Sequence, residues 1–145
     1  MELRPMKKYD LELLLAWRRL LPPNTTRSNQ VPTWEEHLAW YRGKNPGRSN
    51  FIIIHEGHRV GTVAVNLVPD GPWISINIAE PDLRRTGIAT AACNEVLNHL
   101  RSGLWDRCLA EIHTGNVPSQ SFFGRLGFVL ESESEDWQVW SLPLN

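Results

Sequence analysis

Apolar positions along this chain follow two periods, and the longest regular pattern lies near its centre. Over residues 88–101 the apolar side chains recur three and four positions apart, which is the spacing of one buried helical face. An apolar run over residues 73–79 (WISINIA) comes before this helix and predicts a buried strand. Glu80-Pro81-Asp82 ends that strand, because proline donates no hydrogen bond to a ladder. The members of the helical stripe are Ile88, Ala89, Ala92, Cys93, Val96, Leu97 and Leu100.

The first third of the chain predicts one strand and two helices. Residues 2–6 are typical of a short strand, and residues 10–21 of a helix with Asp10 as its N-cap. A polar, irregular segment follows over residues 24–32. A second helix begins after Thr33, which we expect to cap it together with Glu36 in a capping box.

The remaining segments are shorter and mostly extended. Glu56-Gly57-His58 separates two apolar runs and predicts a hairpin, residues 69–72 predict the next turn, and Ser102-Gly103 ends the central helix. Gly127 is expected to stop the last helix. Strands are expected over residues 50–55, 59–68, 107–114, 128–132 and 137–142, and a short helix over residues 119–126.

Composition narrows the class of protein. The chain of 145 residues has the length of a single domain, and its formal net charge of -1 argues against a general nucleic-acid binder. No apolar run is long enough to cross a membrane, and the N-terminus lacks the apolar core of a signal peptide. Cys93 and Cys108 both lie in apolar surroundings, which indicates buried thiols and a reducing, cytoplasmic location. Seven tryptophans are many for this length, and we expect some of them to line a ligand cleft.

The turn at residues 84–89 (RRTGIA) is the first candidate site. A turn of small residues that leads from a strand into a helix leaves backbone N–H groups pointing outward, where the helix dipole favours an anion. A P-loop would require Gly-Lys-Ser/Thr, and a dinucleotide-binding fingerprint would require three glycines after the first strand; both are missing. Taken alone, the turn is more typical of a simple connection between strand and helix.

A second motif, residues 116–128 (NVPSQSFFGRLGF), follows the end of another predicted strand. This pair of motifs, in this order and at this spacing, resembles the GNAT superfamily of acyl-CoA N-acyltransferases. The predicted order of elements, β-α-α-β-β-β-α-β-α-β-β, also resembles that family. The resemblance implies an α/β fold over residues 1–145 as one domain: a mixed, mostly antiparallel sheet of six or seven strands flanked by about four helices. It further implies that the sheet splays between the strands at residues 73–79 and 107–114, where the thioester would lie.

The resemblance also implies a coenzyme site, with acetyl-CoA as cosubstrate and no metal. The turn would hold the pyrophosphate through its amides, and a backbone N–H at the splayed strand end would polarise the thioester carbonyl. Asn116 corresponds to the position whose side chain bonds the pantetheine arm. Thr86 stands where the family usually has Arg or Lys, so one expected positive charge is missing. The residues expected at this site are Ile78, Ala79, Arg84, Arg85, Thr86, Gly87, Ile88, Ala89, Thr90, Asn116, Ser119 and Phe123.

The acid and base of the reaction are less well determined. Phe123 stands where many relatives have the tyrosine that protonates the leaving thiolate, and phenylalanine has no proton to give. Ser119, Ser121 or water could donate that proton instead. A thiol has a pKa of about 8.5, so the coenzyme A thiolate is an adequate leaving group even without a dedicated acid. The attacking amine must be neutral, but an amine with a pKa of about 10.4 is protonated at neutral pH. A base or a water chain that removes this proton is therefore expected. The candidates for that base are Glu80, Glu111 and His113, with Glu35 and His37 on the acceptor side.

The acceptor is expected on a wall formed by the first two helices, with Trp17, Trp34 and His37 as candidate contacts. Packing is an equally ordinary role for Trp34 and His37. The opening of the chain is similar to acetyltransferases of nucleotide-linked amino sugars and to those of ribosomal-protein N-termini. We therefore expect a small-molecule amine or a peptide N-terminus as partner, no nucleic acid and no membrane, and late strands able to pair in a homodimer. A module that binds acetyl-CoA without turning it over is the alternative.

Overall fold

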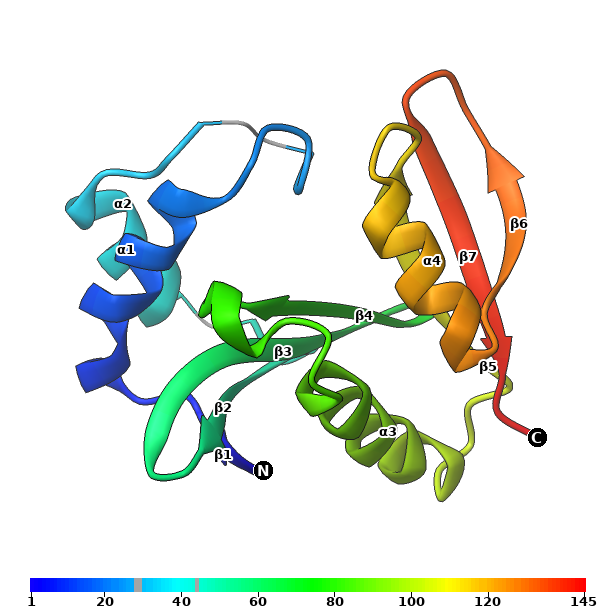
Figure 1. The fold of residues 1–145 in the computed structure, drawn as a ribbon, viewed down its shortest axis with the longest axis horizontal. Helices are drawn as coiled ribbons and strands as arrows, with labels where there is room; N and C mark the ends of the chain where they lie inside the picture. Colours follow the sequence, from blue (N-terminus) through cyan, green and yellow to red (C-terminus); the bar gives the residue numbers. More distant parts are fainter. Residues whose placement is uncertain (28–29, 44) are drawn as a thin grey trace.

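The computed structural model describes residues 1–27, 30–43 and 45–145. Seven strands form one sheet in the order β1-β2-β3-β4-β5-β7-β6, with four α-helices around it (Figure 1). The strands are β1 (Glu2–Pro5), β2 (Arg48–His55), β3 (His58–Val68), β4 (Gly71–Ile78), β5 (Arg107–His113), β6 (Val129–Glu133) and β7 (Trp137–Pro143). The helices are α1 (Leu11–Leu20), α2 (Trp34–Arg42), α3 (Ile88–Arg101) and α4 (Val117–Leu126), with short 3₁₀ turns at η1 (Lys8–Asp10) and η2 (Pro81–Leu83). The predicted order of elements and the mixed, mostly antiparallel sheet are confirmed.

The sheet parts between β4 and β5, as the sequence predicts. These two strands are the parallel pair of the sheet, and the ladder between them joins only Trp73 and Leu109. The other neighbours pair in antiparallel ladders of at least four residue pairs each. Beyond Trp73, β4 runs across the view in Figure 1 while β7, next to β5, stands nearly upright. Over the rest of their length, the edges of β4 and β5 that face each other therefore have no neighbouring strand, while β3 and β7 pair with their other edges.

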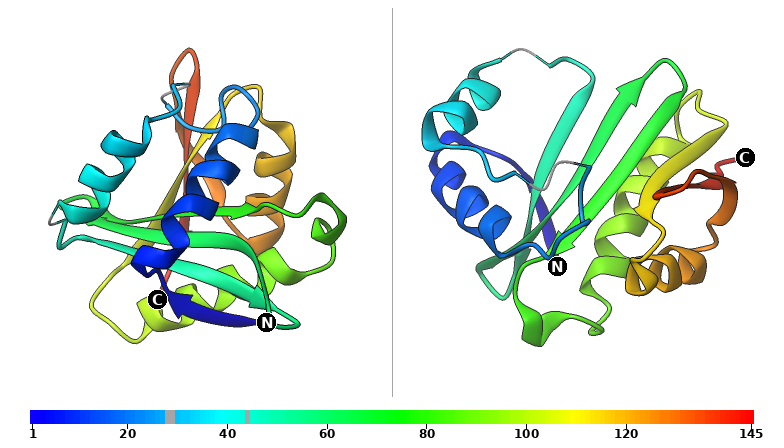
Figure 2. Two further views of the ribbon diagram at one scale, coloured as in Figure 1. Left: turned by 90° about the vertical axis from the view of Figure 1, so that its left-hand side faces the viewer. Right: turned by 90° about the horizontal axis from the view of Figure 1, so that it is seen from above.

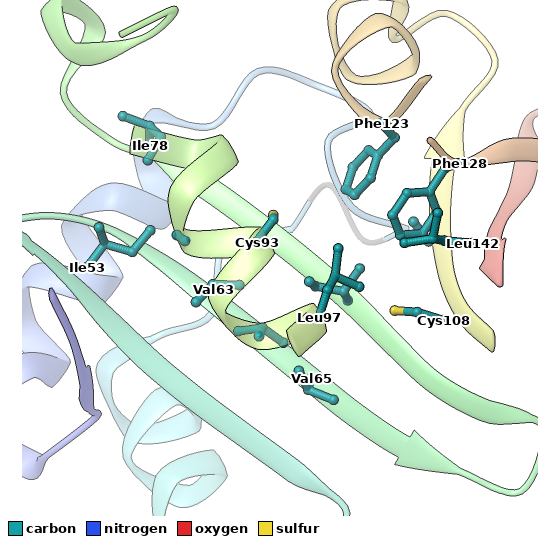
Figure 3. Close-up of a cluster of buried hydrophobic side chains, with 14 of the residues drawn as sticks. Ile53, Val63, Val65, Ile78, Cys93, Leu97, Cys108, Phe123, Phe128 and Leu142 are labelled. Carbon is teal, nitrogen blue, oxygen red and sulfur yellow. The ribbon is translucent and has the colours of Figure 1, made fainter. Parts of the chain in front are cut away.

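The main core lies on the α3 and α4 side of this parting. Alternate residues of β3, β4 and β5 face α3, whose predicted stripe is buried except for the half-buried Ala89 and Leu100. Figure 3 shows Phe123 and Phe128 beside Leu142, with Leu97 of α3 in the same cluster. Each such aliphatic side chain contributes about 1.5–3 kcal/mol when fully buried. The cluster therefore holds both parts of the sheet to α3.

The other face of the sheet carries α1 and α2. Figure 2 shows the two helices beside β2 and β3, on the side away from α3. Leu11, Leu15 and Trp17 are the buried side chains of α1, and Ile52 and Leu109 are buried outside the main core. Among the described helices, none is both long and apolar enough to cross a membrane.

Several predicted boundaries move by a few residues for identifiable reasons. The hairpin turns on Glu56 and Gly57 alone, with φ of 51° and 78°, so His58 already belongs to β3. This pair of left-handed residues is the tight turn whose twist matches that of antiparallel strands. Helix α4 begins at Val117 rather than at residue 119, because Asn116 caps it and Pro118 is tolerated in the first turn. Residues 28–29 of the predicted irregular segment lie outside the described residues.

The prediction that the Asp10 side chain caps the first helix is wrong. Its carboxylate, with no exposed surface, instead accepts hydrogen bonds from Arg4 at 2.9 Å and Arg59 at 3.1 Å. It also accepts from the backbone N–H of Lys7 at 2.8 Å. Burial by itself raises the pKa of this carboxyl, but these hydrogen bonds outweigh it and lower the pKa to about 2. Asp10 therefore ties β1 and β3 to the start of α1.

We expect Asp10→Asn to lower the free energy of unfolding by about 3 kcal/mol, because it removes one partner of a buried ion pair and leaves two guanidinium groups uncompensated. At about 3 °C per kcal/mol for a chain of this size, the thermal midpoint falls by about 9 °C. The matched control is Asp82→Asn at an exposed acid, which should melt within about 1 °C of the parent. Because the pKa of folded Asp10 is depressed, its contribution of about 2 kcal/mol is complete above about pH 4 and is lost as the pH falls toward 2. Equal pH profiles for Asp10→Asn and the parent protein between pH 5 and pH 2 would contradict this assignment.

Candidate active site

The turn from β4 into α3 presents a set of unpaired backbone N–H groups. Gly87 has φ of 89° and Arg85 has φ of 64°, so the chain reverses over two left-handed residues before the helix begins at Ile88. The first helical bond runs from the Ala91 N–H to the Gly87 carbonyl. Within the described part of the chain, the amides of residues 85–90 donate to no protein acceptor. Successive amides in such a turn form a concavity that favours an anion, and the N-terminus of α3 adds partial positive charge.

Gly87 is required here by backbone conformation rather than by space. A Cβ added at this position would meet no atom within 4 Å, so a side chain would fit. The positive φ is costly for residues with a Cβ, however, by roughly 1–2 kcal/mol. The hydroxyl of Thr86 donates to the carbonyl of Leu83 and thereby closes the turn onto η2.

The Arg84 side chain binds the end of strand β4, beside this turn. Its Nε donates to the carbonyl of Ile78 at 3.1 Å, so part of its guanidinium is engaged with β4 rather than with the turn. Together with Trp17 and Ala79, Arg84 lines a small cavity where α1 meets the end of β4. Arg85 is exposed.

Of the two amides predicted to face the thioester, only one points into the parting of the sheet. The Ala79 N–H donates to the carbonyl of Val60 at 2.8 Å and is therefore part of the ladder with β3. Hydrogen-bonding directions alternate along an antiparallel strand, so the N–H and C=O of Ile78 point away from β3 and toward the β5 side. The Arg84 contact already accounts for that C=O. The Ile78 N–H is thus the donor that this strand end can offer.

The second motif forms the start of α4. The side-chain oxygen of Asn116 accepts from the Ser119 N–H at 3.3 Å, so it caps the helix and leaves its amide nitrogen as a donor. Ser119 is half-buried in the first turn. Phe123 is 6% exposed and lies edge-on to Phe122 and Phe128, so its ring belongs to the core.

The candidate acid and base residues are not brought together. Glu111 is bound by Arg27 through two hydrogen bonds, of 2.8 and 2.7 Å. The Nδ1 of His113 accepts from the Gly115 N–H at 2.9 Å, so in the neutral ring the proton resides on Nε2. Glu80 is exposed and lines a groove of about 540 Å³ beside the β2–β3 hairpin. The geometry thus leaves the base undecided between Glu111 and water.

Neither cysteine is placed to act as a nucleophile. Burial raises the pKa of both the Cys93 and the Cys108 thiol to about 12, so both stay protonated at neutral pH. Over residues 1–27, 30–43 and 45–145, no three His, Cys, Asp or Glu side chains gather as ligands of a metal ion would.

The family model described as the acetyltransferase (GNAT) domain matches residues 1–129. The chain belongs to this family.

The chain is similar to a curated archaeal protein and to two crystal structures. An uncharacterized protein of Methanocaldococcus jannaschii is 31% identical over 132 residues, which are 87% of this chain but only 27% of that protein. The chain thus spans about a quarter of the length of this curated relative. A crystal structure of a domain from the same organism superposes with a TM-score of 0.88 at 27% identity, covering 98% of this chain and 97% of that one. The spermidine N-acetyltransferase of Vibrio cholerae, in complex with CoA and spermine, superposes with a TM-score of 0.80 at 16% identity. It covers 99% of this chain and 95% of that one, and at this identity it shows the fold alone.

On the acceptor side of the GNAT domain, His37 has a structural position. Its Nε2 lies 2.9 Å from the carbonyl of Leu11 in α1, and its ring stacks on Trp40 at 5.5 Å. Trp17 is also buried, whereas Trp34 is 39% exposed. Of the three predicted acceptor contacts, Trp34 is therefore the one with free surface.

One contact at the parting of the GNAT sheet, made by Arg27, has no signal in the sequence. Arg27 follows α1 and reaches Glu111, 84 positions further along, and its guanidinium also lies 5.2 Å above the ring of Trp137. No local pattern predicts such a contact. Only the alternation of β5, which places Glu111 and His113 on one face, could have drawn attention to this place.

We expect His37→Phe to lower the free energy of unfolding by about 1 kcal/mol, because it keeps the ring stacking but removes a buried hydrogen bond. Chemical denaturation measures the loss. The control is Glu35→Gln, at an exposed position on the same helix, which should change stability by less than about 0.5 kcal/mol. A His37→Phe protein of unchanged stability would show that the contact with Leu11 does not hold α2 to α1.

Proposed function

We propose that this GNAT domain is a cytosolic, acetyl-CoA-dependent N-acetyltransferase, with residues 1–145 as one catalytic unit. The observation that carries the proposal is the set of unpaired amides at residues 85–90, which follow the end of β4, where β4 and β5 are parted. A diphosphate needs concentrated N–H donors, and a thioester needs an open strand edge; this chain offers both, joined by the short segment that contains η2.

The coenzyme would be held by three groups of this chain. The amides of the turn would bind its pyrophosphate, with charge from the exposed Arg85 beside them. The amide nitrogen of Asn116 would donate to the pantetheine arm. The Ile78 N–H would donate to the thioester carbonyl and stabilise the negative charge that develops there. When bound, acetyl-CoA supplies an activated acetyl group.

Transfer requires a neutral amine and a protonated leaving group. We propose direct attack of the amine in a ternary complex, since both cysteines are buried, protonated thiols. A water chain beside Glu111 would remove the proton of the amine. Ser119 lies one helical turn before the place of the missing tyrosine, and its half-buried position suits a proton donor to the thiolate.

The acceptor in this proposal is a primary amine. A nucleotide-linked amino sugar and a peptide N-terminus are both compatible with the partly exposed Trp34, whose ring can stack on either. The Vibrio cholerae structure shows that a polyamine acetyltransferase has the same fold. A coenzyme-binding module without turnover is the remaining candidate, and it is favoured only by Phe123.

Two measurements test the proposal. Acetyl-CoA at 100 times its Kd should stabilise the protein by about 2.7 kcal/mol, which a thermal shift detects. Thiol release is then measured with amino sugars, N-terminal peptides and polyamines. Absence of any thermal shift would refute the coenzyme site, and a shift without thiol release from any amine would establish the binding module.

We expect Gly87→Ala to weaken acetyl-CoA binding about ten-fold while costing about 1 kcal/mol of stability, because the strained residue relaxes the turn that aligns the amides. Gly57→Ala is a matched control: its φ is 78° and a Cβ there also meets no atom within 4 Å, but it lies in the β2–β3 hairpin. Both variants should lose similar stability, and only Gly87→Ala should lose affinity. Calorimetric titration decides, and equal affinities would remove the turn from the coenzyme site.

Ser119→Ala should lower kcat about 10²-fold if its hydroxyl protonates the thiolate, with little change in the Kd of acetyl-CoA. Ser121→Ala, at an exposed position of the same helix, should retain the parent kcat. A parent-like kcat for Ser119→Ala would assign the proton to water.

A further inference from the structure

We propose that the Glu111 carboxylate and the Trp137 ring form a subsite for a cationic group of the acceptor, and that Arg27 occupies this subsite in the free protein. The inference rests on the proposed function and narrows its acceptor to a small amine that carries a second positive charge.

The contacts of Arg27 have the form of ligand recognition. Its guanidinium donates to both carboxylate oxygens of Glu111, through Nε at 2.8 Å and a terminal nitrogen at 2.7 Å. The same guanidinium lies 5.2 Å above the ring of Trp137, and the ring of His113 lies nearly perpendicular to that ring. A bidentate carboxylate combined with an aromatic face is an arrangement that binds guanidinium and ammonium groups.

The subsite lies on the acceptor side of the parting. Glu111 follows Leu109, the residue where β5 makes its pair with β4, by two positions and shares its face. Trp137 of β7 is paired with His113, so its ring stands next along the same face. Arg27 follows α1 in the chain, and Leu20 and Leu21 at the end of that helix line one small cavity with Asn77 and Ala79 at the end of β4. The segment from Leu21 to Arg27 therefore lies on the α1 side of the opening, as Figure 1 shows, and the Arg27 side chain reaches across to Glu111 of β5.

Glu111 is the only carboxylate on the three strands that border the opening. The strands β4 (GPWISINI), β5 (RCLAEIH) and β7 (WQVWSLP) contain no other acidic residue. A cation that binds along these strands has the Glu111 carboxylate as its anionic partner, and Arg27 now holds that partner. An acceptor with a second positive charge can replace Arg27 with the same contacts, whereas a neutral amino sugar cannot.

Arg27 is a weak enough competitor to be displaced. Its side chain is 65% exposed, and that of Glu111 is 27% exposed, so water and salt screen the pair. A pair of this kind lowers the free fraction of Glu111 to about one fifth, and the apparent affinity of a competing ligand falls by the same factor.

Binding of agmatine, which has a primary amine and a guanidinium, tests the subsite without any transfer step. Binding is followed by calorimetry for the parent protein, Arg27→Ala and Arg27→Ala/Glu111→Gln, with butylamine as the singly charged control ligand. We expect Arg27→Ala to bind agmatine about five-fold tighter than the parent, and Glu111→Gln in that background to weaken it at least ten-fold. Butylamine lacks the guanidinium that pairs with both carboxylate oxygens, so its affinity should change less than that of agmatine across the three proteins. Thermal melts verify that the variants, both at positions with exposed surface, remain folded.

Each failure has a distinct signature. Agmatine affinity that is the same in all three proteins would overturn the subsite, as would equal gains for agmatine and butylamine in Arg27→Ala. If either of these results were found together with thiol release from singly charged amines, the subsite would be refuted and the acetyltransferase proposal would stand. The expected agmatine binding without thiol release from any amine would support the subsite and refute the transferase.

Discussion

The structure depends on how two parallel strands come apart. A parallel ladder normally pairs every other backbone group of both strands, and here it persists for a single pair, Trp73 and Leu109. Past that pair, the backbone of β4 has β3 on one side and no strand on the other. Polar backbone groups at such an edge need another partner, and a substrate can supply it. The opening is therefore a binding edge built into the sheet.

The two parts of the sheet stay together because α3 spans them. Its buried stripe packs against β3 and β4, and through Leu97 it meets the cluster of Phe123, Phe128 and Leu142 from the other part (Figure 3). The core thus closes one face of the parting. On the opposite face, the Arg27 side chain links the two parts of the sheet through an exposed ion pair with Glu111 and a contact with the ring of Trp137. One face is held by buried apolar surface, and the other by contacts that water can weaken.

Phe123 shows how this architecture shapes the chemistry. Its ring is part of the cluster that links α4 to the core, so a packing role accounts fully for an apolar residue at this position. The same substitution removes the hydroxyl expected of a proton donor. A thiol is a good enough leaving group that this loss is compatible with turnover, and the position can serve packing without ending catalysis.

Much of the fold was determined by the sequence alone, because the signals are local. Spacing in α3, the capping box of Thr33 and Glu36, and the existence of a hairpin at Gly57 each depend on residues close by in the sequence. The unpaired amides at residues 85–90 were likewise predictable, since a strand-to-helix turn with one left-handed glycine creates them wherever it occurs. Only the tertiary structure decided that Asp10 binds Arg4 and Arg59, that His37 bonds Leu11, and that Arg27 meets Glu111 and Trp137. Those contacts join residues on different elements, and a polar side chain takes whichever partner the packing of the core brings within reach.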